Sequence, residues 1–152
     1  MVVVLLLLGC GPQGFAIPDG VEEALPGDYQ GSLHFDARAK LGPVRVRQES
    51  CDVDLTVTYD PAMSPAIQGI AACTLGELGL VQAYFGGDVL DMPFVGGDVE
   101  ADVVTGTWEG WFIDADSLHG ESSGKVPYER GMNIVYDATF EVDLANPTAG
   151  SW

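Results

Sequence analysis

The residues best suited to chemistry in this sequence are closely spaced carboxylates. Asp114, Asp116 and Glu121 fall within one short polar segment, and Gly120 favours a turn there. Calcium binds about six to eight oxygen atoms, mostly from carboxylates and carbonyls. The segment therefore indicates a calcium site and a calcium-stabilised adhesion or assembly module. Its spacing departs from that of an EF-hand loop, so a solvated acidic loop remains the alternative.

A second group of carboxylates surrounds a short motif that occurs twice. The motif reads Phe85-Gly-Gly-Asp-Val89 and then Val95-Gly-Gly-Asp-Val99. Two copies are too few for a repeat architecture, and two successive hairpin turns with the same Gly-Gly-Asp sequence explain them. The second candidate calcium site consists of Asp88, Asp91 and Asp98.

Catalytic motifs are absent from the sequence. The two histidines are His34, on the polar side of an expected strand, and His119, in the polar segment of the first calcium candidate. No nucleophile-elbow, Cys-x-x-Cys or His-Glu-x-x-His pattern occurs. Carboxylate pairs suited to glycoside hydrolysis arise by chance among 23 acidic residues, so they carry no specific signal. We therefore expect no enzymatic activity.

The charge balance excludes one class of partner. Six Lys plus Arg stand against 23 Asp plus Glu, which gives a formal net charge of -17. A surface of this sign repels phosphate backbones, so we expect no nucleic-acid binding. The charge either keeps the protein soluble or serves a cation-binding role.

Two tryptophans lie close together in a segment with strand character. In Thr107-Trp108-Glu-Gly-Trp111-Phe112 the two indoles fall on opposite faces of a strand. One of them is expected in the core and the other at the surface or in the mouth of a barrel. Trp108 and Trp111 are therefore candidates for lining a ligand pocket, and a small-ligand-binding barrel is an alternative function.

Strands are the elements expected to position all of these residues. Apolar and polar residues alternate from about residue 29 onward, most clearly over 132–144, and no segment has a long helical period. The inward parity changes between Val46 and Cys51, which predicts a bulge or turn near 48–50. Residues 67–75 and 80–85 read as further strands, the second ending at Gly86-Gly87.

The remaining strand-like segments contain proline or glycine. Pro93 interrupts residues 89–95 and predicts an edge strand or a loop, while Gly106 and Gly110 predict one strongly bent strand over 99–114. About seven to nine strands separated by turn signals indicate an all-β domain, either a single antiparallel β-sandwich or a small closed barrel. A comparison with lipocalin-like barrels is only a loose analogy.

The first residues resemble an export signal. The apolar run from Val2 to Leu8 is shorter than the ~20 residues that span a bilayer, but it fits the hydrophobic region of a signal peptide. Leu7-Leu8-Gly9-Cys10 resembles the lipobox of bacterial lipoproteins. The resemblance implies cleavage before Cys10 and acylation of its thiol, which anchors the chain to a bacterial membrane. No Lys or Arg precedes the run, which favours a signal that begins further upstream. A buried strand ending in an ordinary thiol is the alternative.

The other two cysteines are compatible with export. If Cys10 carries lipid, Cys51 and Cys73 remain as a pair, which an oxidising compartment favours. A bridge between them closes a loop of about 20 residues. Two buried free thiols are the alternative.

The chain is thus expected to have four parts. They are a signal peptide over 1–9, a lipidated Pro/Gly-rich tether over 10–27, an acidic all-β domain over 28–147 and a tail over 148–152. The leading functional hypothesis is a lipid-anchored protein of the cell envelope, on the periplasmic side or the outer surface. Its expected role is non-enzymatic binding or structure, with an envelope protein or a small ligand as partner and no obligatory cofactor.

Overall fold

The structure is a computed structural model that describes the folded part of the chain. The expected signal peptide, Cys10 and all but the last three residues of the expected tether lie outside the described residues. Those described are 25–39, 45–76, 79–91, 94–101, 104–127 and 133–145.

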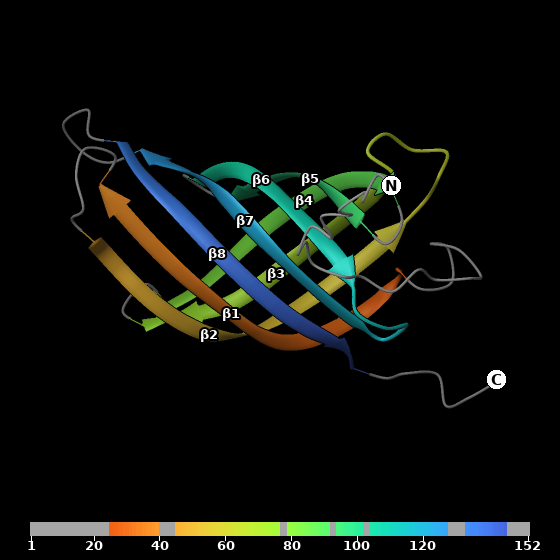
Figure 1. The fold of residues 1–152 in the computed structure, drawn as a ribbon, viewed down its shortest axis with the longest axis horizontal. Coiled ribbons are helices and arrows are strands. Elements are labelled where there is room, and N and C mark those ends of the chain that lie inside the picture. Colours follow the sequence, from red (N-terminus) through yellow and green to blue (C-terminus); the bar gives the residue numbers. More distant parts are fainter. Residues whose placement is uncertain are drawn as a thin grey trace, which may run out of the picture.

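Eight antiparallel strands form a closed barrel (Figure 1). Each strand pairs with the next along the chain, and β8 pairs back with β1, so the sheet has no free edge. The prediction of a small closed barrel is confirmed. The strands are β1 (Gly27–Ala39), β2 (Arg45–Tyr59), β3 (Ile67–Leu75), β4 (Gly79–Asp91), β5 (Phe94–Ala101), β6 (Val104–Phe112), β7 (Ser117–Pro127) and β8 (Asn133–Leu144).

The barrel has two distinct ends. The start of β1, the end of β8 and the loop of residues 60–66 lie at one end, on the right in Figure 1, which we call the terminal end. Backbone bonds fasten this end, since Leu144 N donates to Asp116 O at 2.7 Å and Ala145 N donates to Asp28 O at 2.8 Å. The last residues of β1, β3, β5 and β7 and the first residues of β2, β4, β6 and β8 lie at the opposite end, which we call the far end.

Inward apolar side chains, which alternate with outward side chains along each strand, fill the interior. Odd-numbered side chains point inward from β1 to β5, and even-numbered ones point inward from β6 to β8. Leu25, which the sequence placed in the tether, is fully buried and belongs to the core, so the folded part includes it. The largest fully buried side chains are Tyr29, Phe112, Leu25, Ile67, Val95 and Val142.

The predicted irregularity in β2 exists but lies nearer the start of the strand. The register with β1 is unbroken from Gly27↔Val57 to Ala37↔Arg47, and it shifts at the next pair, Arg38↔Arg45. The prediction of a bulge near 48–50 was therefore wrong in position. The error arose because Arg47 and Glu49 are charged although they point inward, so the sequence does not reveal which side of this part of β2 faces the core.

Two predictions about strand boundaries were also wrong. Residues 89–91 belong to β4 and residues 94–95 to β5, and neither strand is an edge, because each pairs on both sides in the closed barrel. Residues 99–101 end β5 and residues 104–112 form β6, so the segment 99–114 is not one bent strand. Pro93 led to the first error. Gly106 and Gly110 led to the second, because in this barrel they lie inside a strand that closely approaches its neighbour.

No helix among the described residues has the length and apolar character needed to cross a membrane.

Candidate binding surface

Trp108 fills the middle of the barrel. Its side chain points inward from β6 and is buried. The indole Nε1 donates to the carbonyl oxygen of Gly86 at 3.1 Å, and Phe85 meets the ring edge-on with a centroid separation of 5.3 Å. A buried indole with its N–H satisfied is a core residue, so Trp108 supplies packing and not a ligand contact.

The two Gly-Gly-Asp motifs face each other across β4 and β5. Gly86 pairs with Asp98, and Gly87 pairs with Gly97, so the motifs are strand interiors and the prediction of hairpin turns was wrong. A Cβ on Gly87 would come within 3.0 Å of the Trp108 ring. A Cβ on Gly97 would lie 2.1 Å from the carbonyl oxygen of Gly86. The glycines therefore let two strands pass closely beside the indole.

Trp111 lies on the outside of the barrel. It points away from the core and faces His119 across the β6–β7 pair. His119 belongs to strand β7 and not to a loop, and its Nδ1 lies 3.9 Å from the Glu141 carboxylate. Neither the Trp111 ring nor the His119 ring reaches the barrel interior. Trp111 and the inward Trp108 therefore do not line a common pocket.

An ion pair points into the barrel at the far end. Arg47 Nε donates to Glu49 Oε1 at 2.6 Å, and both side chains point inward from β2. The Glu49 side chain is 21% exposed. Its Oε2 atom is shielded from solvent and has no hydrogen-bond partner among the described residues. This pair places two charged side chains in the barrel mouth.

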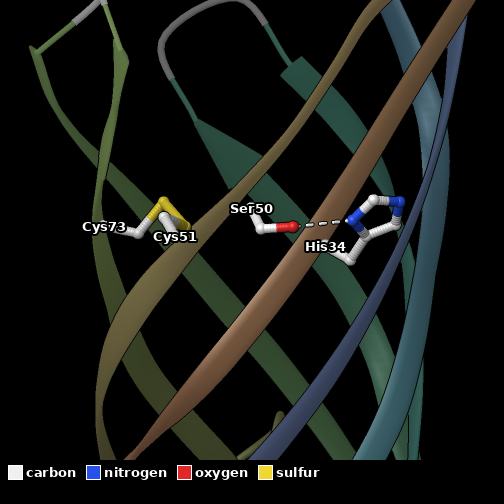
Figure 2. The surroundings of a disulfide bond; sticks show 4 residues. All are labelled: His34, Ser50, Cys51 and Cys73. Atoms are coloured by element: carbon white, nitrogen blue, oxygen red, sulfur yellow. Dashed lines mark hydrogen bonds between the residues drawn. A yellow bond between two sulfur atoms is a disulfide. The ribbon is translucent and has the colours of Figure 1, made fainter.

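A disulfide lies beside this mouth. Cys51 on β2 and Cys73 on β3 are bonded, with their Cα atoms 5.9 Å apart (Figure 2). Both side chains point inward, and Cys73 pairs directly with Val53, the next inward residue after Cys51. The predicted pairing is confirmed.

His34 contacts polar neighbours on the outer surface (Figure 2). Its Nδ1 lies 2.8 Å from Ser50 Oγ, and the Gln48 amide nitrogen lies 3.0 Å from its Nε2. Which ring nitrogen donates in these two contacts depends on the tautomer of His34.

The structure does not bring the first calcium candidate together. Asp114 Oδ1 accepts a bond from Asp116 N at 2.9 Å, which forms a local turn between β6 and β7. Glu121 points outward from β7, where it pairs with Glu109. Across the described ranges, no three acidic, histidine or cysteine side chains converge closely enough to hold a metal ion.

The second calcium candidate is similarly dispersed. Asp88 Oδ1 accepts a bond from Ala66 N at 3.1 Å and so attaches the loop of residues 60–66 to β4. Asp91 is exposed at the end of β4, and Asp98 points outward from β5. Asp88 thus holds a loop, while Asp98 lines an outer groove.

The outward side chains of β3, and those of β4 as far as Gly87, form an uncharged surface, which we call the neutral face. The described parts of these strands between Ile67 and Gly87 contain no charged residue. Tyr84 is 59% exposed and Leu80 is 67% exposed on the outside of β4. The large apolar side chains exposed on the neutral face are Ile70, Leu80 and Tyr84, and Leu90 is exposed further along β4, beyond Asp88.

An open groove of about 470 Å³ crosses this neutral face. Ile70, Tyr84 and Pro65 provide apolar contacts, and Asp98 and Glu100 line its β5 side. A smaller groove of about 290 Å³ is also lined by Pro65 and Asp98 and continues beyond them. Both grooves lie on the outside of the barrel.

Pro65 sits directly over a glycine of β4. A Cβ placed on Gly86 would come within 2.8 Å of the Pro65 ring, which is too close for either group to remain in place. Gly86 lines both grooves together with Pro65. The groove therefore exists because β4 has no side chain at this outward position.

Two buried tyrosines have raised pKa values. Burial, and then the Asp116 carboxylate, raise the pKa of Tyr29 to about 12, and its hydroxyl donates to Leu25 O at 3.1 Å. Burial raises the pKa of Tyr136, and a hydrogen bond with Ser122 partly opposes that shift. Both phenols remain neutral at physiological pH and serve as structural groups.

The neutral face was not predicted from the sequence, although the scarcity of charged residues between Asp60 and Asp88 indicated it. Between Asp60 and Asp88 the only charged residue is Glu77, in a chain of net charge -17. A long uncharged stretch in such a chain marks a region with a different environment. Which of its residues point outward follows only from the strand register.

Comparison with known proteins finds few similarities. No protein-family model matches the chain, and no curated protein matches it. Among solved structures, a redesigned β-barrel matches with a TM-score of 0.46 and 8% identity, over 77% of this chain and 93% of that one. A protein of unknown function of the DUF3598 family from Nostoc punctiforme matches with a TM-score of 0.40 and 14% identity, over 80% of this chain and 48% of that one.

Proposed function

We propose that the protein is a lipid-anchored protein of the cell envelope that binds partners through the outside of its barrel and has no enzymatic activity. The observation that carries this proposal is that the two grooves lie on the outside of the barrel, whereas side chains pack its interior. Trp108 and its neighbours fill the interior, while both grooves open on the outer surface. A filled small barrel is a rigid scaffold, and its outer side chains are the groups available for recognition.

Two features of the sequence support the proposed compartment. Leu7-Leu8-Gly9-Cys10 resembles a lipobox, and Cys51 and Cys73 form a bridge of the kind that persists in oxidising compartments. Two or more acyl chains on Cys10 would give stable membrane attachment, because each buried CH₂ contributes ~0.8 kcal/mol.

Intact mass of the protein purified from its own host tests the anchor. We expect a chain that starts at Cys10, with a mass increased by acyl groups, and that partitions into the detergent phase. Cys10→Ser should remain unprocessed and water-soluble. Cys51→Ser combined with Cys73→Ser is the matched control, since it removes the two bridged cysteines together and should leave acylation unchanged. An unmodified, water-soluble wild-type chain would refute the anchor.

A second candidate function is binding of a small ligand in the barrel mouth. The inward Arg47–Glu49 pair favours it, because Glu49 Oε2 is buried without a hydrogen-bond partner among the described residues. Such an atom is a suitable anchor for a ligand hydroxyl or amine. Native mass spectrometry of the purified protein should then detect a bound small molecule that Glu49→Gln loses. A wild-type protein that carries no such molecule leaves the outer surface as the binding region.

A further inference from the structure

We propose that the larger groove on the neutral face binds a partner protein through a segment in which an apolar side chain lies beside Lys or Arg. The inference rests on the binding role proposed above, and it does not require the lipid anchor. It assigns a partner class to one defined surface, the groove lined by Ile70, Tyr84, Asp98 and Glu100.

The apolar part of the partner follows from the exposed side chains. Single exposed apolar residues are common on proteins, but a gathered set around a groove marks an interaction site. Ile70 and Tyr84 are directly paired across β3 and β4, both are exposed, and both line the groove. Tyrosine at a groove supplies a large contact area at a small cost in side-chain entropy.

The positive charge of the partner follows from the β5 side of the groove. Asp98 and Glu100 point outward there, and Glu100 pairs directly with Tyr84. No Lys or Arg lines this groove among the described residues, so its two carboxylates are not neutralised locally. A Lys or Arg of the partner would reach these carboxylates and lie over the Tyr84 ring.

The shape of the groove favours a chain segment over a free small molecule. Small-molecule sites typically enclose about 70–90% of the ligand surface. This groove is open, and a second groove of about 290 Å³ continues from it past Pro65. An extended segment could occupy both. Both β3 and β4 are paired on each side, so the segment would be recognised by side-chain contacts and not by adding a strand.

Charge also disfavours two other occupants. A second copy of this chain has the same net charge of -17 and would place like charges near Asp98 and Glu100. An anionic membrane surface would be repelled by the same carboxylates. A cationic segment is the occupant whose charge complements the groove.

The experiment measures binding of labelled peptides to the purified full-length chain. The probe is a short peptide in which Lys alternates with Leu and Phe. One control peptide replaces every Lys by Glu, and the other replaces Leu and Phe by Ser. We expect the probe to bind at least about tenfold more tightly than either control, because the groove requires both the charge and the apolar groups.

Matched variants test whether the groove is the site. Tyr84→Ser, and separately Asp98→Asn combined with Glu100→Gln, should each weaken probe binding about tenfold or more. Leu80→Ser removes an exposed apolar side chain of the same strand outside the groove, and Asp52→Asn combined with Asp54→Asn removes two charges from β2. These controls should change binding by less than about twofold. Unchanged near-ultraviolet circular dichroism shows that each variant is folded.

Several outcomes would overturn the proposal. They are no binding of the probe, equal losses in the groove variants and the β2 control, or binding of free benzylamine as tight as that of the peptide. Binding to anionic vesicles that Tyr84→Ser abolishes would assign the face to a lipid surface instead. None of these results depends on acylation of Cys10, so failure of the anchor and failure of the groove are distinguishable.

Discussion

Two regions of the outer surface differ in what their side chains do. The acidic face, which we define as the outward residues of β8, β1 and β2, has polar side chains that bond to one another across strands. The neutral face of β3 and β4 exposes apolar side chains instead. The cross-strand partners on the acidic face include Asp28 with Thr56, Asp54 with Gln30, and Asp137 with Arg38.

The contrast teaches which residues the fold requires. Both faces have the same inward alternation, since β2 buries Val53, Leu55 and Val57 while β3 buries Ile67 and Leu75. Outward side chains are not needed to fill the core, so their chemistry is free to differ between faces. The absence of charge from the described parts of β3 and of β4 up to Gly87, in a chain of net charge -17, is the basis of the binding role that we propose for this face.

The largest expected effect lies in the core that both faces share. Trp108→Ala should destabilise the protein by about 3–5 kcal/mol, because it removes a buried aromatic ring and the hydrogen bond to Gly86 O. Urea unfolding measures the loss. Trp111→Ala, which removes an outward ring of the same strand, should cost much less. Equal losses would contradict the placement of Trp108 as the core member.

The protein should lose stability at high pH because of Tyr29, which is buried at the terminal end of the barrel. The pKa of Tyr29 is raised from 10.0 to about 12 in the folded state, so the stabilisation is complete below pH 10 and is lost as the pH rises through about 12. The expected loss is roughly 2–3 kcal/mol across that interval. Urea unfolding as a function of pH measures it. Tyr29→Phe should flatten this part of the profile, and a profile as steep as that of the wild type would contradict the assignment.

A smaller loss of stability is expected from a substitution on the neutral face. Gly86→Ala should cost about 1–2 kcal/mol, because its new methyl group would displace the Pro65 ring and the loop of residues 60–66. Thermal unfolding measures the cost. Gln82→Ala, at an outward position on the same strand, is the control and should be nearly neutral. If both variants behave alike, Pro65 does not sit on Gly86 as described.

The smallest effect tests the charge difference between the faces directly. Asp52→Lys on the acidic face should stabilise the protein by roughly 0.2–1 kcal/mol, because it relieves repulsion among neighbouring carboxylates. Gln82→Lys on the neutral face should give less. The gain should vanish in about 1 M salt, where charges are screened within ~3 Å. A salt-independent gain, or equal gains on both faces, would remove the electrostatic distinction.

Sequence reasoning identified the features that depend on alternation alone. The all-β domain and the opposite placement of Trp108 and Trp111 follow from a period of two, which leaves a sandwich and a closed barrel equally open. The Cys51–Cys73 pair follows from two cysteines in strand-like segments. Features that depend on a neighbouring strand were missed. Gly87 and Gly97 read as turn residues until Trp108 is placed beside them.

The candidate site was less predictable than the fold for the same reason. Carboxylates close in sequence, such as Asp114 and Glu121, are separated by the start of a strand, so their spacing did not predict convergence. Tyr84 and Glu100 are adjacent in space through the register of β4 and β5. That register is set by the whole barrel, and no local motif records it.

Amide chemical-shift mapping of the isotope-labelled full-length chain tests the central claim most directly. During titration with the Lys-rich apolar peptide, the shifts should change around Ile70, Tyr84, Asp98 and Glu100. Residues near Asp137 on the acidic face and Glu49 in the mouth should stay unchanged. Shifts spread over the acidic face would mean that only net charge attracts the peptide, and shifts centred on Glu49 would place recognition inside the barrel. Either result would contradict binding through the neutral face.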